Sequence, residues 1–412
     1  MSRSTTAPSA TGGERAAVAR HDVVVVGGGN AGLSLAGKLL REGARDVAVV
    51  EPARVHHYRP MLSYVAGGQA ELAELQHAQD EVGPSGARRY AGAVVAVDPR
   101  RSTVTLADGR ELGYGDLALC PGSDVDWDAI PGSREAVATP AASTSYLPEH
   151  AVDVWPMLTG VRAGRVVVVV DDRHVPCAPV ILKPLVMALE HWRATGVRGA
   201  IDVEVLLASE TFVPLPRAEA ELRAMLEEQG VALRTGVRVS AVEPRDGDGD
   251  GGTVVTVDGV RTPYDALLLA PPHRAPAWVA ASGLTTSEGG FVVVDPDTLQ
   301  VPGHPRIWAL GDVADLDALP SGGALRQQVP VVAHNIAARR TGRAMRIYDG
   351  YSIAPVTTRA HRLLLAEFDR DGREEPTIPV GDLVRPRAAS WFFDRYVEPV
   401  VYLRRLLRGK VG

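Results

Sequence analysis

A glycine-rich turn near the start of the chain has residue types and spacing suited to holding a phosphate. Residues 27–32 read Gly-Gly-Gly-Asn-Ala-Gly and stand between an apolar run and a helix-like stretch. In such a unit Gly27 permits the tight turn, Gly29 lets the backbone approach a pyrophosphate, and Gly32 lets the helix pack closely on the strand. Glu51 ends the next apolar run, where a carboxylate accepts the ribose hydroxyls of an adenosine. The pattern predicts a dinucleotide site, against the alternative of a glycine turn in a ligand-free α/β protein.

A second motif favours FAD over NAD at that site. Residues 307–312 read Ile-Trp-Ala-Leu-Gly-Asp, a strand-like run that ends in Gly311 and Asp312 and precedes a helical pattern. This arrangement resembles the second flavin motif of enzymes with two dinucleotide domains, in which the Asp binds the ribityl chain. The following helix then points its N-terminus at the flavin ring, where its dipole suits the charge of the reduced cofactor. Taken alone, Asp312 is explained equally well as a helix N-cap; together with the fingerprint it predicts FAD.

The second strand–loop–helix unit lacks the glycines that a nucleotide requires. Its apolar run, 166–170, leads into residues 171–177, which read Asp-Asp-Arg-His-Val-Pro-Cys. Side chains in this loop would keep the backbone away from a pyrophosphate, and the two carboxylates would repel it. We therefore expect that NAD(P)H does not bind there in the usual way and that the electrons come from another donor. No paired-cysteine motif follows the first fingerprint, which argues against a dithiol reductase.

The elements that must position these motifs predict an α/β fold. We expect two Rossmann-like dinucleotide-binding-type domains, the second one degenerate, and a C-terminal module associated with a membrane or a quinone. The expected boundaries are a flexible tail over 1–20, an FAD-binding domain over 21–150 and 285–345, a second nucleotide-binding-like domain over 151–284, and the C-terminal module with an amphipathic tail over 346–412.

Composition excludes several classes of protein. A net charge of −6 over 412 residues gives no reason to expect a nucleic-acid partner. No stretch reaches the roughly 18 apolar residues of a membrane span, and the first twenty residues lack the apolar core of a signal peptide, so we expect a cytoplasmic location. The two cysteines, Cys120 and Cys177, are too few for a disulfide scaffold. The stretch 246–251 begins like a calcium loop, but Val257 stands where a bidentate Glu is required, so no metal is predicted.

Several further motifs make a family resemblance specific. They span roughly residues 21 to 410, and the chain resembles the sulfide:quinone oxidoreductases of the mitochondrial-like type. The matching segments are Glu51-Pro52, His56-His57-Tyr58-Arg59-Pro60, Val65-Ala66-Gly67-Gly68, Pro176-Cys177-Ala178 with Lys183, His191-Trp192-Arg193, Tyr348-Asp349-Gly350-Tyr351 with Pro355, Leu364, Ala366-Glu367-Phe368, and Pro399, Tyr402, Leu407-Arg408-Gly409.

The resemblance implies an activity and a set of site residues. Members of that family oxidise sulfide and pass two electrons through FAD to a quinone, using two cysteines near the flavin. One of these cysteines matches Cys177, and we expect Lys183 and a helix N-terminus to lower the pKa of its thiol. The predicted FAD contacts are Gly27, Gly29, Asn30, Ala31, Gly32, Glu51, Arg59, Val95, Gly122, Gly311 and Asp312.

The chain departs from the family at the second cysteine. The partner thiol is expected directly after the Gly-Asp motif, where this chain has Val313. Without a partner, sulfide cannot open a Cys177 disulfide to leave a persulfide beside a free thiolate. Cys120 is the other candidate, and a small buried residue is the favoured interpretation of it. Cys177 itself is interpreted as a reactive thiol, with a relic as the alternative.

The end of the chain predicts contact with a membrane. Residues 385–412 carry seven Arg or Lys against two acids, and five aromatic residues fall between 391 and 402. On a helical wheel from Pro399, one side carries Val400, Tyr402, Leu403, Leu406 and Leu407, and the opposite side carries Arg404, Arg405 and Arg408. A basic amphipathic helix suits an anionic lipid surface, here the inner face of the cytoplasmic membrane. The alternative is a helix docked on the protein's own core or on a second copy.

Three functions follow from these features. The leading hypothesis is an FAD enzyme that oxidises sulfide or a related small sulfur species and reduces a membrane quinone. The second keeps the fold and oxidises another donor, including NADH bound in a nonstandard way. The third is a non-catalytic flavin-binding protein at a membrane surface. A homo-oligomer is left open.

Overall fold

The structure is a computed structural model that describes residues 18–245, 251–377 and 381–410. Its first domain is built on a seven-stranded sheet in the order β5-β2-β1-β8-β7-β6, with β20 beside β8. The strands β5, β2, β1, β8 and β20 are parallel, and β6 and β7 add antiparallel to one edge. The strands are β1 (Ala19–Val26), β2 (Val47–Glu51), β5 (Arg88–Ala91), β6 (Val94–Asp98), β7 (Thr103–Leu106), β8 (Glu111–Leu119) and β20 (Ile307–Ala309).

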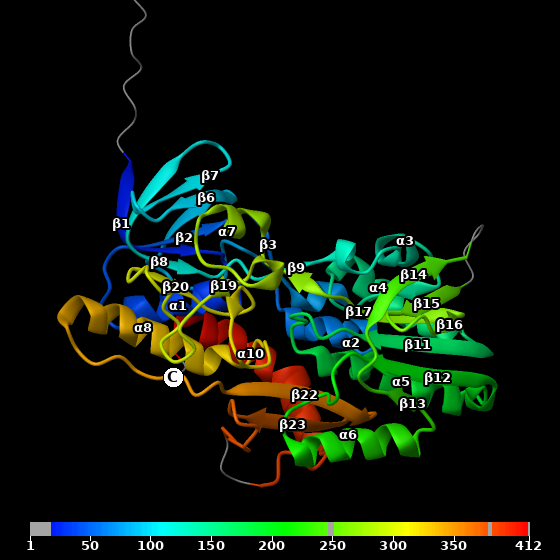
Figure 1. The fold of residues 1–412 in the computed structure, drawn as a ribbon. Coiled ribbons are helices and arrows are strands. Elements are labelled where there is room, and N and C mark those ends of the chain that lie inside the picture. Colours follow the sequence, from blue (N-terminus) through cyan, green and yellow to red (C-terminus); the bar gives the residue numbers. More distant parts are fainter. Residues whose placement is uncertain (1–17, 246–250, 378–380, 411–412) are drawn as a thin grey trace, which may run out of the picture.

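Two helices from distant parts of the sequence cover this sheet together. Helix α1 (Asn30–Arg41) follows the glycine-rich turn, and α8 (Leu325–Thr341) packs against it from nearly 300 residues away (Figure 1). The strand β1 reads as a continuous apolar run, with Val23–Val26 buried, because parallel strands covered by helices bury both faces. Helix α1 begins at Asn30, so the last three fingerprint residues, Asn30, Ala31 and Gly32, already belong to the helix.

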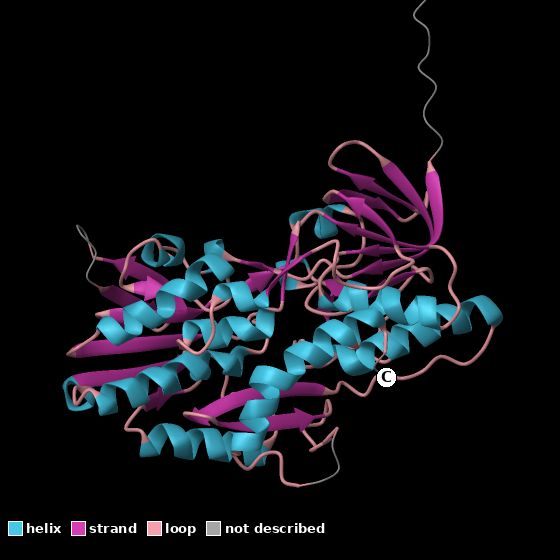
Figure 2. Ribbon diagram, turned by 180° about the vertical axis from the view of Figure 1, so that it is seen from behind, coloured by secondary structure: helices cyan, strands magenta, loops and turns pink. Residues whose placement is uncertain are grey.

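The second domain is a five-stranded parallel sheet with helices packed on it. Its strand order is β10-β17-β11-β12-β13, and Figure 2 shows the helices beside it from behind. The elements are β10 (Ala142–Ser143), β11 (Gly164–Val170), β12 (Ile201–Leu207), β13 (Ala232–Arg234), β17 (Ala266–Ala270), α4 (Pro148–Gly160), α5 (Leu182–Ala194) and α6 (Pro216–Glu228). A three-stranded antiparallel sheet, β14 (Val239–Pro244), β15 (Gly252–Thr256) and β16 (Arg261–Tyr264), lies beside it. The acidic stretch 246–250, between β14 and β15, is outside the described residues.

Short pairs of strands and small helices complete the two domains and their connections. They are β3 (Val55–His57) with β4 (Gln76–Ala78), β9 (Asp124–Val125) with β18 (His273–Arg274), β19 (Val292–Val293) with β21 (Ala314–Asp315), and the helices α2 (Leu62–Ala66), α3 (Ser133–Val137) and α7 (Ala277–Ala281). The β9–β18 pair is antiparallel and brings together two chain segments that connect one domain to the other.

The C-terminal region consists of a hairpin and a helical segment that bridges the domains. The hairpin is β22 (Ser352–Arg359) with β23 (Arg362–Phe368), and β22 packs on α5 of the second domain. The helical segment, called the C-terminal segment below, runs from 388 to 408 as α9 (Ala388–Phe392), a π-helical stretch (Phe393–Val397), α10 (Glu398–Arg404) and a 3-10 turn (Leu406–Arg408). It starts on β23 and ends on α1 of the first domain.

The expected α/β fold with parallel, Rossmann-like sheets is therefore present. The predicted flexible tail falls mostly on residues 1–17, outside the described part of the chain, and Ala19 and Arg20 already belong to β1. Within the described residues, no helix combines the length and the apolar character that crossing a bilayer requires.

Candidate active site

The three fingerprint glycines form a close-packed turn with one open side. A Cβ at Gly27, whose φ is +103°, would lie 2.1 Å from the carbonyl oxygen of Cys120, and a Cβ at Gly32 would lie 1.8 Å from that of Gly27. Gly29 has no atom of the chain within 4 Å of the corresponding position. Gly29 is also the N-cap of α1, where no side chain caps the helix and no acid stands in the first turn. The free N–H groups of this helix N-terminus, next to an open surface at Gly29, fit a pyrophosphate.

The carboxylate of Glu51 is fixed at the edge of the same turn. Its Oε2 accepts a hydrogen bond from the Gly28 N–H at 2.6 Å, and its Oε1 accepts one from the Ala53 N–H at 2.7 Å. Each carboxylate oxygen has a second lone pair, so both remain available to the hydroxyls of a ribose. This is the placement that the sequence predicts for Glu51.

The Gly311-Asp312 motif lies directly against the fingerprint. A Cβ at Gly311 would be 3.2 Å from the Cβ of Ala31, although the two residues are 280 positions apart. The half-buried carboxylate of Asp312 makes no hydrogen bond or ion pair with the described residues; burial raises its pKa, and Arg59 opposes that shift. Arg59 is exposed and likewise has no ion-pair partner in this part of the chain. An acid and a cation that interact electrostatically, and whose polar groups have no partner among the described residues, fit a polar ligand between them.

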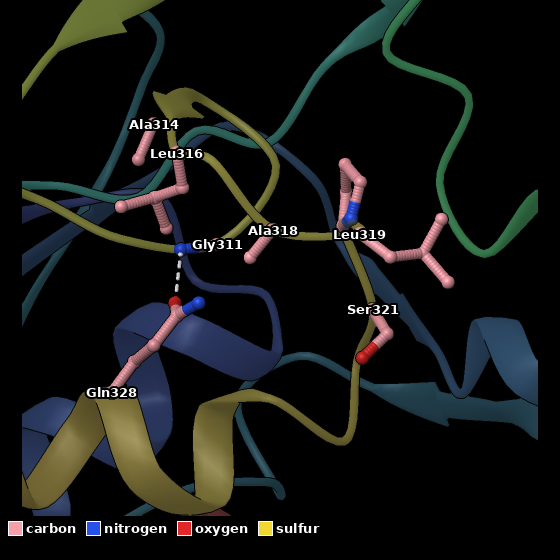
Figure 3. A pocket seen from close by; sticks show the side chains of 8 residues that line it. Gly311, Ala314, Leu316, Ala318, Leu319, Ser321 and Gln328 are labelled. Carbon is pink, nitrogen blue, oxygen red and sulfur yellow. Dashed lines mark hydrogen bonds between the residues drawn. The ribbon is translucent and has the colours of Figure 1, made fainter. Parts of the chain in front are cut away.

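The helix after Asp312 does not start where the sequence suggests. Helix α8 begins at Leu325 with Ala324 as its N-cap, so the N-cap alternative for Asp312 is wrong. A loop of twelve residues intervenes, and the contact with the motif comes instead from Gln328, whose Oε1 accepts the Gly311 N–H at 2.9 Å (Figure 3). The side chain of Gln328 therefore holds the N-terminal turn of α8 beside Gly311, although the helix does not follow the Gly-Asp motif directly.

The remaining predicted FAD residues are placed unequally. Asn30 donates from Nδ2 to the carbonyl oxygen of Gly322 at 3.1 Å, which ties the fingerprint to the loop after β21. Gly122, with φ +75°, has open space where a Cβ would stand. Val95 is exposed at an irregularity of β6, and no hydrogen bond of its own joins it to the fingerprint; the Gly92 N–H, three residues earlier, donates to the carbonyl oxygen of Glu51. The contact of Val95 with a cofactor stays a prediction.

The loop after β11 is closed by its own side chains. Asp171 is buried and accepts from the Arg173 guanidinium at 2.7 Å, and Asp172 pairs with Arg238 at 3.0 Å. The ring of His174 stacks on Phe291 of the first domain, with centroids 3.9 Å apart. The loop therefore consists of paired and stacked side chains and contains no glycine between Asp171 and Cys177.

Cys177 lies in a strained loop next to the first domain. Its φ is +48°, its N–H donates to the carbonyl oxygen of Pro320 at 2.7 Å, and its Sγ is 3.6 Å from the carbonyl oxygen of Ile353. Burial raises the pKa of this thiol to about 12; Lys183 lowers it, and Asp394 and Asp312 raise it. The expectation of a lowered pKa is therefore wrong in this structure, because desolvation outweighs the single cation.

Neither position that was considered for a partner thiol, 313 or 120, places a second thiol beside Cys177. Val313 is fully buried in the core of the first domain, at the position where the family pattern has a cysteine. Cys120 is buried in that same core, whereas Cys177 packs against the core of the second domain. Both cysteines are free, and burial raises the pKa of Cys120 strongly. The interpretation of Cys120 as a small buried residue is confirmed.

Lys183 is engaged by two residues that the sequence analysis did not identify. Its Nζ donates to Oδ2 of Asp394 at 2.8 Å and lies 4.5 Å from the ring centroid of Tyr64. The Tyr64 hydroxyl donates to the same Oδ2 at 2.5 Å. Asp394 is 211 residues from Lys183 and in the segment interpreted as basic, so no local pattern points to the pair.

A small cavity lies between the Gly-Asp motif and the Cys177 loop. It is lined by Gly311, Gln328 and the loop from Ala314 to Ser321, and its volume is about 10 Å³ (Figure 3). That is about the space one water molecule needs. Pro320, in its wall, is the residue whose carbonyl holds the Cys177 N–H.

The C-terminal segment docks with most of the side that was predicted to face a membrane. Tyr402, Leu406 and Leu407 are buried in the core of the first domain, and the Tyr402 hydroxyl is 2.7 Å from Nε2 of buried His56. A Cβ at Gly409 would lie 2.2 Å from the backbone of α1, which shows how closely the chain ends pack. The prediction that this side contacts lipid is wrong for these three residues, because they pack in the core of the first domain, next to α1. The large hydrophobic residues of the segment that are left exposed are Phe392, Tyr396 and Val400.

Comparison with known proteins agrees with this geometry. The family model described as pyridine nucleotide-disulphide oxidoreductase matches residues 21–169 and 187–342. Two relatives are the mitochondrial sulfide:quinone oxidoreductases of Dictyostelium discoideum, 26% identical over 393 residues (94% of this chain and 86% of the relative), and of Mus musculus, 27% identical over 401 residues (95% and 87%). The crystal structure of the sulfide:quinone oxidoreductase from Aquifex aeolicus superposes with a TM-score of 0.78 at 16% identity, covering 96% of this chain and 92% of that one.

The chain belongs to the pyridine nucleotide-disulphide oxidoreductase family, whose model covers most of its length. It is an oxidoreductase that binds FAD, and the prediction of this cofactor is confirmed. Among its relatives the mitochondrial-like sulfide:quinone oxidoreductases match along nearly the whole chain, so the resemblance inferred from the motifs is confirmed as well. Within the described residues, no group of three or more His, Cys, Asp or Glu is arranged to hold a metal ion.

Proposed function

We propose that this protein oxidises sulfide, or a related small sulfur species, and passes the electrons through FAD to a membrane quinone. The observation that carries the proposal is the free, half-buried thiol of Cys177, which lies within electrostatic reach of Asp312 in the flavin motif. The closed loop at Asp171–Cys177 supports a donor other than a nicotinamide. The names of the relatives, sulfide:quinone oxidoreductases, indicate the same donor and acceptor.

The residues of the site would divide the work as follows. Gly29 and the N-terminus of α1 hold the pyrophosphate of FAD, Glu51 holds the ribose, and Asp312 with Arg59 lines the path to the flavin ring. FAD, when bound, supplies a two-electron acceptor next to the thiol. The Cys177 sulfur joins HS⁻ to give a persulfide, which releases one proton and two electrons. A quinone takes up two electrons with two protons and leaves as the quinol.

The acceptor side of the proposal rests on what the C-terminal segment leaves exposed. Phe392, Tyr396 and Val400 recur every four residues and are 56%, 48% and 48% exposed, so they form one apolar stripe on the outer side of the segment. Arg404 and Arg405 continue from its end and are exposed as well. An apolar stripe flanked by cations suits the interface of an anionic bilayer, where long-tailed quinones reside. We place the protein peripherally on the inner face of the cytoplasmic membrane.

Anaerobic mixing of the FAD-loaded protein with sulfide tests the proposal. The flavin absorbance is expected to bleach, and a water-soluble short-chain quinone is expected to restore it. Cys177→Ser should abolish bleaching at neutral pH, while Cys120→Ser, the matched control for a cysteine in the core, should leave the rate within about twofold. A flavin that stays oxidised in sulfide, or an undiminished rate in Cys177→Ser, would remove sulfide oxidation by this thiol.

A second candidate function is favoured by Val313. A valine at this fully buried position provides no thiol to reform a disulfide with Cys177. In this second function, the site oxidises a different small donor. Parallel reduction trials with NADH, NADPH and sulfide separate the two functions, because one donor should bleach the flavin much faster than the others. A flavin that none of them reduces would favour the third function, a non-catalytic flavin protein at a membrane surface.

A further inference from the structure

We propose that the C-terminal segment is a structural part of the flavin site, in which Tyr402 and Glu398 are positioning residues for FAD. Tyr402 supports the phosphate turn, residues 27–32, and Glu398 supports the Gly-Asp motif at 311–312. The inference rests on the placement of FAD proposed above. It does not depend on which donor reduces the flavin, because it concerns the binding of the cofactor and not its reduction.

A backbone contact joins the end of the segment to helix α1. Gly409, directly after the segment, has a φ of +64°, and a Cβ there would lie 2.2 Å from the backbone carbonyl carbon of Gly37 in α1. A Cβ at Gly37 would in turn lie 2.6 Å from the backbone nitrogen of Gly409. Glycine at both positions permits this approach. Because the phosphate turn includes the first residues of α1, the position of this helix also sets the position of the N–H groups that face a phosphate.

Tyr402 makes a second contact between the segment and this half of the site. Its hydroxyl is 2.7 Å from Nε2 of His56, and the two residues are 3% and 4% exposed. Burial lowers the pKa of His56 to about 4, although hydrogen bonds with the Gln79 side chain and the Gly28 backbone oppose this shift. The ring is therefore uncharged at neutral pH, and a buried imidazole needs a partner within the protein at each nitrogen. Tyr402 is that partner for Nε2.

His56 connects Tyr402 to the phosphate turn. In the antiparallel register of β3 with β4, Gln79 is the diagonal neighbour of His56. Nε2 of Gln79 donates to the carbonyl oxygen of Gly28 at 2.9 Å, and the Gly28 N–H donates to Glu51 at 2.6 Å. Both backbone groups of Gly28 are thus bound by side chains, and one of these side chains lies beside the ring that Tyr402 fixes.

Glu398 reaches the other half of the site through helix α8. Its Oε1 binds the guanidinium of Arg326 at 2.5 Å, and the two side chains are 15% and 21% exposed. Arg326 lies in the first turn of α8, and Gln328, two residues further on, accepts the Gly311 N–H at 2.9 Å. The ion pair therefore holds the turn of helix that contacts the Gly-Asp motif. Removing one partner of a largely buried pair leaves the other charge uncompensated, so this turn should depend on Glu398.

The test is the dissociation constant of FAD, measured by diluting the flavin-loaded full-length protein and following the fluorescence of the released FAD. Tyr402→Phe keeps the ring and removes the hydroxyl, and Glu398→Gln keeps the shape and removes the charge. We expect each substitution to raise the dissociation constant about fivefold, a change typical of the loss of one internal hydrogen bond. An unchanged constant in either variant would overturn the role of that residue.

Tyr114→Phe and Glu74→Gln are the matched controls. Tyr114 lies in the same core as Tyr402, and its buried hydroxyl has no hydrogen-bond partner among the described residues. Glu74→Gln breaks a different ion pair of the same segment, that with Arg395. Both should leave the constant within about twofold of the parent, as is usual for changes away from the contacts that matter. Equal losses of affinity in the controls would overturn the proposal.

Hydrogen exchange in the parent protein provides a measurement that needs no variant. If the segment strengthens FAD binding, FAD must stabilise the docked segment by the same factor. Amide exchange in residues 398–409 should therefore slow when FAD binds, beyond any slowing in α6 of the second domain, and the absence of this additional protection would overturn the proposal. Gly29→Ala separates the two inferences. If it keeps its FAD affinity, the placement of FAD is wrong; if it loses affinity while Tyr402→Phe and Glu398→Gln keep theirs, only the role of the segment is wrong.

Discussion

At the scale of single residues, the fingerprint glycines serve different purposes that only their surroundings reveal. Gly27 and Gly32 are required by the fold itself, because a Cβ at either would overlap a backbone carbonyl. A Cβ at Gly29 would meet no atom within 4 Å, and the φ of Gly29, −78°, is one that any residue adopts. The absence of a side chain at Gly29 therefore benefits a ligand rather than the packing.

This difference yields a paired prediction on the glycines. Gly29→Ala should fold with a melting temperature close to that of the parent but lose FAD affinity by about tenfold or more, because its methyl group enters the space of the pyrophosphate. Gly32→Ala should be destabilised strongly or fail to fold, since its Cβ would lie 1.8 Å from the Gly27 oxygen. Flavin content after reconstitution and thermal unfolding of the apoprotein provide the measurements. Full flavin occupancy in Gly29→Ala would show that the cofactor lies elsewhere.

At the scale of elements, the C-terminal segment performs two tasks with different faces. Its inner face carries Tyr402, Leu406 and Leu407 into the core of the first domain, and its ion pairs at Asp394 and Glu398 reach both domains. Its outer face keeps Phe392, Tyr396 and Val400 exposed. Through these contacts the segment connects the two domains, in addition to any contact that it makes with lipid.

The C-terminal segment, docked in this way, contributes to the stability of the first domain. Leu407→Ala should lower the free energy of unfolding by about 3 kcal/mol, because it removes a fully buried side chain and leaves a cavity. Val400→Ala, on the exposed stripe of the same segment, should change it by less than about 0.5 kcal/mol. Urea unfolding of the purified variants distinguishes the two. Equal and small effects would mean that the end of the chain is not docked in solution.

At the scale of the whole molecule, the residues proposed for the site come from both Rossmann-like domains. The first domain supplies the phosphate turn, Glu51 and Asp312, while the second supplies Cys177 and Lys183 on the loop and helix after β11. In the second domain, the loop after β11 carries ion pairs and a histidine whose ring stacks on the first domain. A site assembled across the domains in this way requires that they stay closed on each other.

The outer stripe gives a prediction for the intact protein. Phe392→Glu with Tyr396→Glu should reduce co-sedimentation with vesicles that contain an anionic phospholipid, because charge replaces apolar contact at the interface. Ile347→Glu is the matched control, since Ile347 is 71% exposed but outside the C-terminal segment. Raising the salt concentration should weaken binding of the parent as the contribution of Arg404 and Arg405 is screened. Unchanged sedimentation of the double variant would exclude this face as the membrane contact.

The sequence by itself determined the features that depend on short-range pattern. The strand–glycine–helix unit, the position of Glu51 at the end of the next strand, the Gly-Asp motif and the missing glycines after β11 are local, because each follows from residue types at fixed spacing along one chain segment. Their placement in the structure agrees with that interpretation. The amphipathic pattern after Pro399 could likewise be identified from the sequence alone.

Only the tertiary structure decided which surfaces and charges those segments meet. The apolar side of the C-terminal segment docks on α1 because folding brings residues 406–408 next to this helix. A helical periodicity in the sequence does not distinguish a side that faces a protein core from one that faces lipid. Lys183 was expected to activate Cys177, but an acid 211 residues away occupies it, and burial raises the pKa of the thiol instead. Electrostatics act through space between groups that folding brings together, so a pKa belongs to the folded molecule rather than to a motif.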